Sequence, residues 1–557
     1  MSSPVYTVAA DCRDCYRCVR SCPVSAIRVA GGRAHIEDEL CVGCGTCVRE
    51  CPRRAKRIRN DLESAKALAQ GGRAAASVAP SFAALYGGPL ALRLPSALRR
   101  LGFAVVGETA AGAEYITERS FAPGRSGRIC TACPAAVSYV EKYRPRLRGE
   151  LIGVASPMVA HGRLLKALYP GVGVVFIGPC AAKKAEARRE ENRDAVDCAL
   201  TFEELAQWLG EEGVNLEQCP ESGFDYSGSC GKARLFPMEG GMLAAGGKDP
   251  GPPAGHLPVS GARAVMDLLG DEAAVAALTV IEPLFCAGGC VNGPALGAEG
   301  SLYTRRARVA AYAASSSDDT GRERPEVPVE RAFTAEPVDM EPVPQSAIEK
   351  IFETMGKTDP EQRPDCGACG YPTCEENAAA IARGMAEPEM CMPYMRRLAQ
   401  QRTDRIIETM PCGVVILDAE LNMLQMNPAF MKMFMCGGGI LGRRVSYLLK
   451  ADGYEAVQSG AAEKYESVQV KYGIKFHELI YALRENGQYA GIYSDITKLT
   501  YDPAHLDAIK TQTLRHAQEF LEHQVSFSQE MAHFLGKSAA KSEEIAKQLI
   551  GLYSEDG

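Results

Sequence analysis

The sequence of 557 residues lacks long hydrophobic runs, an excess of basic residues and the cysteine density of a disulfide-stapled protein. No apolar run approaches the ~18–20 residues of a membrane-spanning helix, so we expect no membrane protein. The N-terminal stretch has no charged segment followed by an apolar one, which argues against a signal peptide and for a cytoplasmic location. The formal net charge of −7 argues against a nucleic-acid partner.

Cysteine is nevertheless the outlier of the composition, with 22 residues against a single tryptophan. This is below the ~8–10% of small secreted disulfide scaffolds. In a reducing cytosol, thiols serve more often as metal ligands or catalytic groups than as disulfides. The useful question is therefore how many of these cysteines fall into patterns that hold metal.

Eight cysteines lie within residues 1–60, in two copies of the pattern C-x2-C-x2-C-x3-C-P. Three closely spaced thiolates can hold three irons of one cubane, while the fourth ligates the other cluster. The pattern therefore predicts two [4Fe-4S] clusters, one held by Cys12, Cys15, Cys18 and Cys51, the other by Cys41, Cys44, Cys47 and Cys22. A structural zinc site is the alternative. The duplicated pattern resembles a bacterial two-cluster ferredoxin, which implies a module that connects a redox centre to the outside.

Residues 71–312 have the pattern of a larger α/β domain. Apolar runs predict buried strands at Leu151–Val154, Val172–Ile177 and Leu278–Ile281, and helical spacing predicts a helix over Val159–Tyr169. Three cysteine peptides lie in this domain: Cys130-Thr-Ala-Cys133-Pro134, Gly178-Pro-Cys180-Ala-Ala-Lys183-Lys184-Ala-Glu186, and Glu282-Pro-Leu-Phe-Cys286-Ala-Gly-Gly-Cys290. The second and third follow predicted strands, where open α/β sheets bind cofactors. The residues alone predict a buried four-thiolate metal site with Lys183 as a nearby cation, unless Lys183 is a solvated surface residue.

Together the three peptides resemble the active-site signatures of [FeFe]-hydrogenases, over roughly residues 75–312. The resemblance implies that Cys133, Cys180, Cys286 and Cys290 hold the [4Fe-4S] part of an H-cluster. Cys290 would also bridge to a [2Fe] subcluster carrying CO, cyanide and azadithiolate, and Lys183 would donate a hydrogen bond to a cyanide. The implied chemistry is heterolytic cleavage of H2 or its formation from protons, with dedicated maturation enzymes. Lys183 and Glu186 favour retention of the [2Fe] pocket.

The sequence departs from that family pattern at a position that matters for proton transfer. Where prototypical members have a cysteine that relays protons, this chain has Ala132, which has no ionisable proton. Ala136 and Leu284 also replace the usual tryptophan and methionine. We therefore expect slow turnover. Cys130 could replace the relay but is expected to be a buried apolar thiol, and Glu118 is matched loosely to a proton-path glutamate.

Two further modules are predicted downstream of residues 313–346, whose composition predicts a linker or a surface excursion. Residues 347–394 contain Cys366, Cys369, Cys374 and Cys391 and a predicted helix over Glu375–Met385. This module resembles the small [4Fe-4S] domain of the corrinoid iron–sulfur protein, with zinc as the competing interpretation.

After a polar helix at Met395–Met410, residues 402–498 resemble a PAS domain with an unspecified ligand. Here Asp418 is predicted to end a strand, Asn427 to start a helix and Asp495-Ile-Thr497 to close the sheet. Residues 502–553 predict a C-terminal helix with an apolar seam, suited to homodimerisation or signalling.

The predicted fold class is α/β multidomain, and the order of modules resembles the sensory [FeFe]-hydrogenases of anaerobic bacteria. This resemblance implies a slow hydrogenase that senses H2 or redox state, exchanges electrons with a partner such as ferredoxin, and signals through PAS to a separate kinase or phosphatase. The alternatives are a catabolic ferredoxin-dependent hydrogenase and a non-hydrogenase iron–sulfur protein without the [2Fe] unit, like the hydrogenase-related factor of eukaryotic cluster assembly. Six cysteines have no predicted role: Cys130, Cys198, Cys219, Cys230, Cys412 and Cys436.

Overall fold

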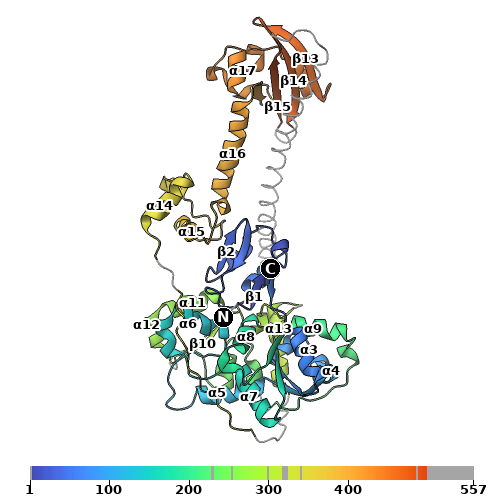
Figure 1. Cartoon of the computed structure of the whole chain (residues 1–557), viewed down its shortest axis with the longest axis vertical. Coiled ribbons are helices and arrows are strands. Elements are labelled where there is room, and N and C mark those ends of the chain that lie inside the picture. The colour runs from blue at the N-terminus through green and yellow to red at the C-terminus, as the bar shows by residue number, and fades with distance from the viewer. Residues whose placement is uncertain are drawn as a thin grey trace, which may run out of the picture. The chain divides into compact units, whose positions relative to one another are not determined.

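The computed structural model describes residues 3–227, 231–251, 255–297, 300–315, 324–338, 342–483 and 487–497. The chain divides into two compact units, Met1–Cys391 and Met392–Gly557, which are described separately (Figure 1). The C-terminal helix predicted at residues 502–553 lies outside the described residues. No helix in the described part of the chain combines the length and the apolar character needed to cross a membrane.

The first unit begins with a small module of two antiparallel hairpin-like pairs and two short helices. Strand β1 pairs with β4, and β2 pairs with β3. The elements are β1 (Val5–Thr7), α1 (Arg17–Ser21), β2 (Ile27–Ala30), β3 (Arg33–Ile36), α2 (Thr46–Glu50) and β4 (Lys56–Ile58). Each helix contains the third cysteine of one pattern, Cys18 in α1 and Cys47 in α2, so the two halves of the duplicated sequence pattern have the same local structure.

A four-stranded parallel sheet forms the centre of the α/β domain, in the order β6-β5-β7-β8. The strands are β5 (Ala74–Val78), β6 (Phe103–Glu108), β7 (Gly173–Gly178) and β8 (Cys198–Thr201). The central strand β5 is buried along its whole length, as expected for a parallel sheet covered by helices on both faces. The strand predicted at Val172–Ile177 is β7, and its carboxyl end leads directly into the Cys180 peptide.

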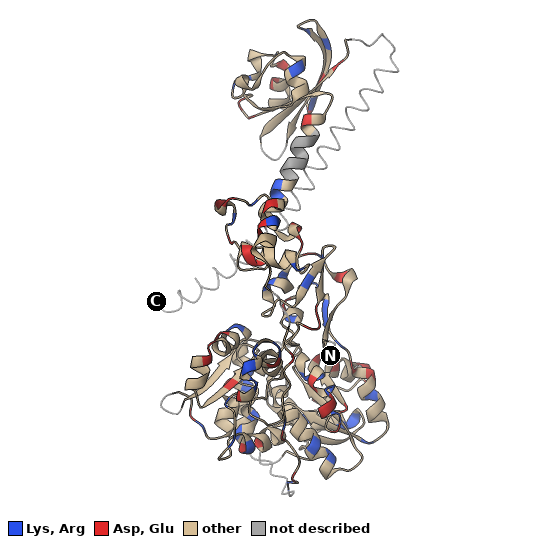
Figure 2. Cartoon of the chain, turned by 60° about the vertical axis from the view of Figure 1, so that its left-hand side comes forward, with Lys and Arg blue, Asp and Glu red and all other residues tan. Residues whose placement is uncertain are grey.

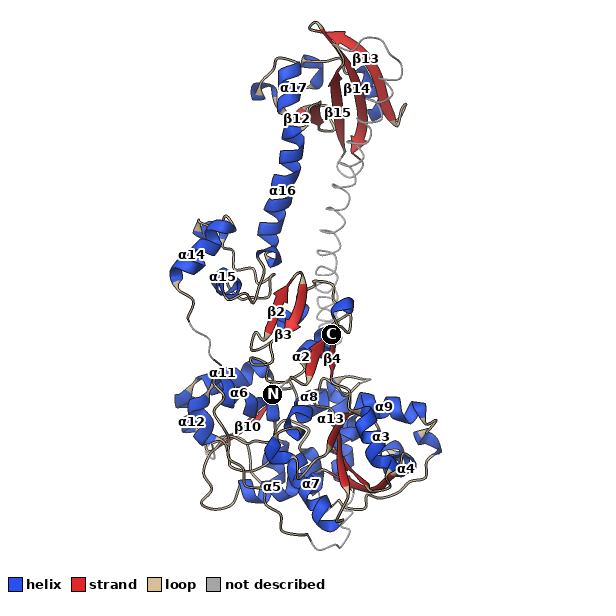
Figure 3. Ribbon diagram, viewed as in Figure 1, coloured by secondary structure: helices blue, strands red, loops and turns tan. Residues whose placement is uncertain are grey.

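Helices surround this sheet (Figure 3). The helices of the whole α/β domain are α3 (Leu62–Gln70), α4 (Pro89–Arg100), α5 (Ala110–Ser120), α6 (Pro134–Tyr143), α7 (Pro157–Leu168), α8 (Ala181–Ala187), α9 (Phe202–Glu211), α10 (Gly241–Ala245), α11 (Ala262–Gly270), α12 (Glu272–Ala277) and α13 (Leu302–Ala314). Proline occupies the first position of α4, α6 and α7, where its missing N–H costs no hydrogen bond. A second, parallel pair contains β9 (His256–Ser260) and β10 (Val280–Leu284), beside which α11 and α12 lie.

One expectation for this domain needs correction. Leu151–Val154 is not a regular strand, since Leu151 and Val154 form only isolated bridges, to Ile129 and Glu330. Within the segment 313–346, predicted as a linker or surface excursion, residues 324–338 form a strap that lies on the domain, because its backbone finds partners there. Ala155 N donates to Val329 O at 2.7 Å, and Arg331 N donates to Gly153 O at 3.0 Å.

The cysteine-rich module contains α14 (Gln345–Thr354) and α15 (Cys374–Ala382) and packs on the ferredoxin-type module (Figure 1). Val29 N, on β2, donates to Met385 O at 2.9 Å, and Arg20 Nη1 donates to Ala368 O at 2.9 Å. The helix predicted over Glu375–Met385 is α15, which begins one residue earlier and ends at Ala382. Two modules from opposite ends of the first unit are therefore in direct contact.

The second unit contains a five-stranded antiparallel sheet of order β12-β11-β15-β14-β13. Its elements are α16 (Met392–Thr409), β11 (Gly413–Leu417), β12 (Met423–Met426), α17 (Pro428–Met433), α18 (Asp452–Gln458), β13 (Lys464–Lys471), β14 (Ile474–Leu483) and β15 (Gln488–Asp495). Asp418 directly follows β11, and Asn427 caps α17 by accepting from Phe430 N at 2.8 Å. Thr497 Oγ1 donates to Asp495 Oδ1 at 2.5 Å at the end of the sheet.

Lysine and arginine positions are interspersed with aspartate and glutamate positions along the backbone of the α/β domain (Figure 2). This distribution agrees with the nearly balanced composition of 62 basic and 69 acidic residues.

Candidate functional site

Four cysteines of the α/β domain come from the ends of different elements. Cys133 is the N-cap of α6, and Cys180 lies between β7 and α8. Cys286 follows β10, and Cys290 begins a short 3-10 turn. Because strand ends and helix starts fix the backbone on both sides, these thiols are held by regular structure.

The same four thiols converge on one buried centre. Burial raises the pKa of Cys286 well above its ordinary value, and the neighbouring thiols of Cys290, Cys180 and Cys133 raise it further. Burial, with the neighbouring thiol of Cys133, also raises the pKa of Cys180 to about 11. Thiolates are the metal-binding form, so ionisation of several adjacent buried thiols requires the compensating charge of bound metal. No three Cys, His, Asp or Glu side chains among the described residues lie close enough to hold a single metal ion.

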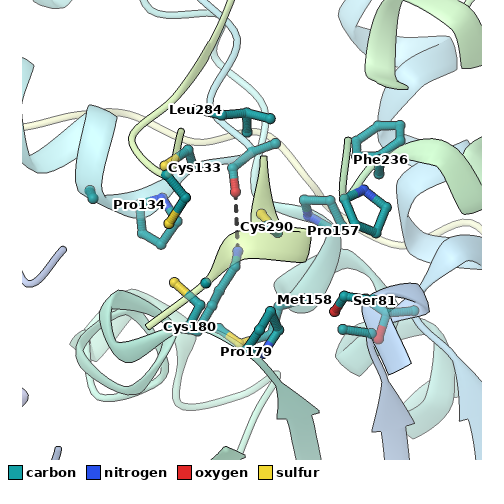
Figure 4. Close-up of a pocket in the computed structure, with 18 of the residues that line it drawn as sticks. Ser81, Cys133, Pro134, Pro157, Met158, Pro179, Cys180, Phe236, Leu284 and Cys290 are labelled. Atoms are coloured by element: carbon teal, nitrogen blue, oxygen red, sulfur yellow. Dashed lines mark hydrogen bonds between the residues drawn. The ribbon is translucent and has the colours of Figure 1, made fainter. Parts of the chain in front are cut away.

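A cavity of about 90 Å³ adjoins this centre. By the same measure, one water needs ~10–15 Å³, so the cavity has room for a group of several atoms. Its lining is mostly apolar and includes Met158, Phe236 and Leu284 (Figure 4). The hydroxyl of Ser81 is buried on this cavity and has no hydrogen-bond partner among the described residues. An unpartnered buried donor beside four thiols is what a ligand-bearing metal group would satisfy, so the lining fits such a group.

Lys183 is the cation of the site. Its Nζ donates to Glu186 Oε2 at 2.7 Å and to Ala132 O at 3.3 Å, the dashed line of Figure 4. An ammonium has three N–H donors, so one donor remains for a group in the cavity. Lys183 is only 9% exposed, which excludes the alternative of a solvated surface lysine.

Glu186 is itself held by three groups, which makes it a positioning residue. It accepts from Ser156 Oγ at 3.0 Å and from Arg331 Nη1, on the strap, at 3.2 Å, besides Lys183. Burial opposes the ionised form, but Lys183 and Arg331 outweigh it and lower the pKa of Glu186. Its carboxylate therefore stays charged and fixes the ammonium.

The residues considered for proton transfer occupy different places. Ala132 lines the cavity, whereas Cys130 is buried in the hydrophobic core, where burial and the nearby Glu282 raise its pKa. Glu118, matched to a proton-path glutamate, is exposed and forms an ion pair with Arg324 at 2.6 Å. It is outside the set of residues that line the cavity. This placement does not favour a role in proton transfer to the site.

Glu282, which the sequence did not single out, lies close enough to Cys290 to raise the pKa of that thiol but is outside the set of residues that line the cavity. It is buried, and its carboxylate accepts from the backbone N–H groups of Met242 and Leu243, each at 3.1 Å. Burial raises its pKa to about 7. This carboxyl can therefore exchange a proton near neutral pH.

The eight cysteines of the ferredoxin-type module form two groups. Cys18 has Cys15, Cys12 and Cys51 as neighbouring thiols, and Cys47 has Cys44, Cys22 and Cys41. This grouping is the crossed arrangement expected from the duplicated spacing. Each group therefore has the four thiols that a cubane needs.

The second of these groups reaches the centre in the α/β domain. Cys44 has Cys133 as a neighbour and also lines the cavity. Gly45 makes the approach possible, since a Cβ there would lie 2.6 Å from Pro294 Cγ. The ferredoxin-type module and the α/β domain are therefore in close contact at Gly45 and Pro294, next to the group of Cys44 and the four-cysteine centre.

The cysteine-rich module brings its four thiols together as well. Cys369 has Cys391 and Cys366 as neighbours, and Cys374 and Cys391 both accept hydrogen bonds from Lys357. Burial raises the pKa of Tyr371 to about 12, and the neighbouring thiols of Cys369 and Cys22 contribute to this rise. Tyr371 thus lies between this group of thiols and the ferredoxin-type module.

Sequence reasoning missed Ser81, Arg331 and Lys357. Ser81 follows a buried strand in a Pro-Ser dipeptide, a signal that could have been noticed beside the strand-end cysteines. Arg331 lies in a segment whose composition predicted a linker, and its pairing with Glu186 depends on tertiary structure alone. Lys357 follows Gly356 after an amphipathic helix, a weak signal of a helix end rather than of a site.

Three family models match separate parts of the chain. The model described as iron only hydrogenase large subunit, C-terminal domain, matches residues 73–249. A 4Fe-4S dicluster domain matches residues 4–53, and an Fe-S cluster domain matches residues 363–393. The chain is therefore a hydrogenase-like iron–sulfur protein with two further iron–sulfur domains.

Curated relatives are of two kinds. The cytosolic Fe-S cluster assembly factor NAR1 of Kluyveromyces lactis is 38% identical over 109 residues, which cover 18% of this chain and 23% of that protein. Iron hydrogenase 1 of Clostridium pasteurianum is 26% identical over 217 residues, covering 34% of this chain and 37% of the relative. The chain thus matches less than half the length of these relatives.

Similar solved structures include the [FeFe]-hydrogenase HydA(deltaEFG), with 19% identity and a TM-score of 0.40 over 50% of this chain and 100% of that one. A second is the E141Q variant of HydA1 from Chlamydomonas reinhardtii, also 19% identical, with a TM-score of 0.38 over the same shares. A PAS domain of an HTR-like protein from Haloarcula marismortui has 19% identity and a TM-score of 0.16 over 18% of this chain and 97% of that one.

Proposed function

We propose that this chain binds H2 and activates it slowly at a [2Fe] unit held beside the four-cysteine centre. The observation that carries the proposal is the cavity, which adjoins Cys290 and Lys183 and contains the unpartnered hydroxyl of Ser81. When bound, such a unit supplies heterolytic H2 chemistry, which belongs to the cofactor. The chain supplies attachment, orientation and a dry environment.

Each lining residue has a distinct role in this proposal. Cys290 would attach the unit, and the remaining N–H of Lys183 and the hydroxyl of Ser81 would orient its cyanide ligands. Glu186 holds the ammonium in place through the 2.7 Å ion pair. Met158, Phe236 and Leu284 exclude water. A hydrogen bond from an ammonium in such a dry site is stronger than in water.

Slow turnover follows from Ala132. Its methyl group occupies the cavity wall at the position where a proton donor would be needed, and methyl groups carry no transferable proton. Protons must then enter by a less direct route, which limits the rate of exchange rather than the binding of H2.

Infrared spectroscopy of the protein after maturation tests the proposal. We expect CO and cyanide stretching bands, with the cyanide bands displaced in a Lys183→Met variant because its hydrogen bond is removed. A protein that holds its full complement of cubane iron but shows no such bands would contradict the proposal.

The second candidate is an iron–sulfur protein without the [2Fe] unit, which acts in cluster assembly. The curated relatives favour it over the slow hydrogenase, because most of the similar relatives found are cluster assembly factors. This candidate predicts no CO or cyanide bands and predicts transfer of a cluster to an apo-acceptor protein. The same infrared measurement therefore separates the two functions.

Sensing of H2 or redox state extends the first proposal. It is supported by the order of the modules and by the five-stranded sheet with its Asp495-Thr497 contact. A cytoplasmic location, four cubanes, a redox partner such as ferredoxin, a separate kinase or phosphatase and a homodimer are parts of this proposal. Hydrogen exchange of the second unit under H2 and under N2 tests it, and identical exchange would contradict sensing. High H2 evolution from reduced ferredoxin would instead favour a catabolic hydrogenase.

A further inference from the structure

A buried lysine contacts the thiols of the cysteine-rich module. Lys357 is 3% exposed, and its Nζ donates to Cys374 Sγ at 3.3 Å and also hydrogen-bonds Cys391. Both cysteines are themselves buried. The ammonium therefore lies inside the module, beside two of its four predicted ligands.

The backbone fixes the position of Lys357. Helix α14 ends in a Schellman arrangement, in which Gly356 has φ = 58° and donates to Glu353 O at 2.9 Å. Lys357 N then donates to Phe352 O at 2.7 Å, and Arg363 Nε donates to Lys357 O at 2.9 Å. The side chain thus leaves a locked helix end in a defined direction.

The buried charge needs a counter-charge. An unpaired ammonium away from water costs several kcal/mol, and a neutral thiol is a weak hydrogen-bond acceptor. Among the described residues, the hydrogen-bond partners of Nζ are the two sulfurs. The arrangement is satisfied when Cys374 and Cys391 are thiolates bound to metal, which supports a cluster in this module.

Three sulfurs of the ferredoxin-type module have neutral hydrogen-bond donors instead. Cys22, Cys41 and Cys51 accept from the backbone N–H groups of Ala26, Gly43 and Ala55, at 3.3, 3.3 and 3.2 Å. The buried ammonium of Lys56 lies near Cys18 and Cys47, but it donates to Thr7 Oγ1 and Ala34 O and to neither sulfur. Hydrogen bonds from an ionised donor are about twice as strong as neutral ones. Hydrogen bonds to the sulfurs, together with net charge, set the reduction potential of such clusters.

We propose that Lys357 raises the reduction potential of the cluster in the cysteine-rich module, so that this cluster is reduced in preference to the clusters of the ferredoxin-type module. Reduction adds a negative charge, which a cation in a low-dielectric interior favours. In this step a ferredoxin-type cluster loses one electron and is oxidised, the module's cluster gains it and is reduced, and no bond or proton changes place.

The contact between the modules makes this transfer direct. Cys18 and Cys369 belong to one packed core, with Tyr371 beside both Cys369 and Cys22. Gly370 approaches α1 so closely that a Cβ there would lie 2.9 Å from Val19 Cγ1. The inference rests on a cluster in this module and is independent of the [2Fe] unit.

The test is a redox titration of the full chain, followed by electron paramagnetic resonance, in protein produced without maturation enzymes. The signal absent from a Cys369→Ser variant identifies the module's cluster. We expect Lys357→Met to lower the midpoint potential of this cluster alone and to abolish its preferential reduction by a substoichiometric amount of dithionite. Lys357→Arg, which keeps the charge, and Lys350→Met, which removes an exposed charge from the same helix, should keep the native potential.

The potentials of the Lys357 variants decide whether the ammonium raises the reduction potential of the module's cluster. An unchanged potential in Lys357→Met with full iron content would overturn the inference, as would an equal shift in Lys357→Arg. If Lys357→Met loses the cluster, retention at the native potential in Lys357→Arg supports the role of charge, and loss in both variants overturns it. None of these outcomes depends on CO or cyanide bands, so the test is separate from that of the proposed function.

Discussion

At the scale of single residues, the methyl group of Ala132 borders a cavity that is also lined by the Lys183 ammonium and by the hydroxyl of Ser81, which has no partner among the described residues. Under the proposed function, Ala132 stands where a proton-donating side chain would complete a proton path. Lys183 Nζ donates a hydrogen bond to Ala132 O at 3.3 Å, so the backbone of residue 132 also helps to hold the ammonium.

Replacing Ala132 by Cys should restore a proton donor at the cavity. General acid–base groups contribute about 10²–10⁴-fold to rates, and we expect an increase of that order in hydrogen–deuterium exchange by the matured protein. Ala132→Ser is the matched control, because its hydroxyl is of similar size but does not ionise near neutral pH. An unchanged rate in fully matured Ala132→Cys would contradict the proposed cause of slow turnover.

His161 gives the α/β domain a predictable response to acid. It is fully buried, and its Nδ1 lies 2.7 Å from Ser77 Oγ. Burial lowers the pKa of His161 to about 3, whereas the unfolded chain binds the proton near 6.5. Below this value the unfolded state binds more protons, so stability falls as the pH falls, by about 2 kcal/mol between pH 7 and pH 5.

Urea unfolding can be followed through Trp208, which is the sole tryptophan of the chain and is buried in this domain. In a His161→Gln variant the difference in unfolding free energy between pH 7 and pH 5 should shrink by about 2 kcal/mol. The His256→Gln variant, which changes a half-buried histidine of the same domain, should keep the difference. An undiminished pH dependence in His161→Gln would refute this explanation.

At the scale of elements, local pattern predicted much of the architecture. Val172–Ile177 became β7, Asn427 capped α17, and Asp418 followed β11, because buried strands and helix caps are local signals. The residues around Glu186 were not predictable in this way. Its three hydrogen-bond partners come from residues 156, 183 and 331, and only the folded chain brings Arg331 to it.

The interface between α1 and the cysteine-rich module can be tested at Gly370. Its φ is 103°, and an added Cβ would lie 2.9 Å from Val19 Cγ1 and 3.2 Å from Arg20 N. We expect Gly370→Ala to separate the modules and to speed hydrogen exchange of the Val29 amide, which donates to Met385 O. The exchange rate should rise tenfold for each ~1.4 kcal/mol by which the substitution weakens the interface.

Gly384 provides the matched control for this change. Its φ is 70°, so alanine strains the backbone there too, but no atom lies within 4 Å of the added Cβ. Gly384→Ala should therefore leave the exchange of Val29 unchanged. Equal exchange in both variants would show that strain, and not the close approach to α1, controls the interface.

At the scale of the molecule, the four groups of thiols in the first unit follow one another in space, each next to the following one. The cysteine-rich module contacts the ferredoxin-type module, and Cys44 of that module lies against Cys133. The order along this path differs from the order in the sequence, where the cysteine-rich module comes after the hydrogenase-like domain. Spacing alone predicted each group but could not predict that the last one joins the first.

Interrupting this path should isolate the four-cysteine centre. A Cys44→Ser variant is expected to lose about four irons, one [4Fe-4S] cluster, and reduced ferredoxin should then reduce the outer clusters but not the centre. Freeze-quench paramagnetic resonance measures both. Cys436→Ser, which changes a half-buried cysteine of the second unit, is the control and should alter neither. Unimpaired reduction of the centre in Cys44→Ser would exclude this path.

The strap has a consequence for biosynthesis. Cys290, the last thiol of the centre, precedes Arg331 by 41 residues. At a translation rate of about 5–20 residues per second, about 2–8 s pass between synthesis of these two residues. During that interval the nascent chain has all four thiols but not the arginine that pairs with Glu186. The four-cysteine centre is therefore synthesised before the strap that covers Glu186.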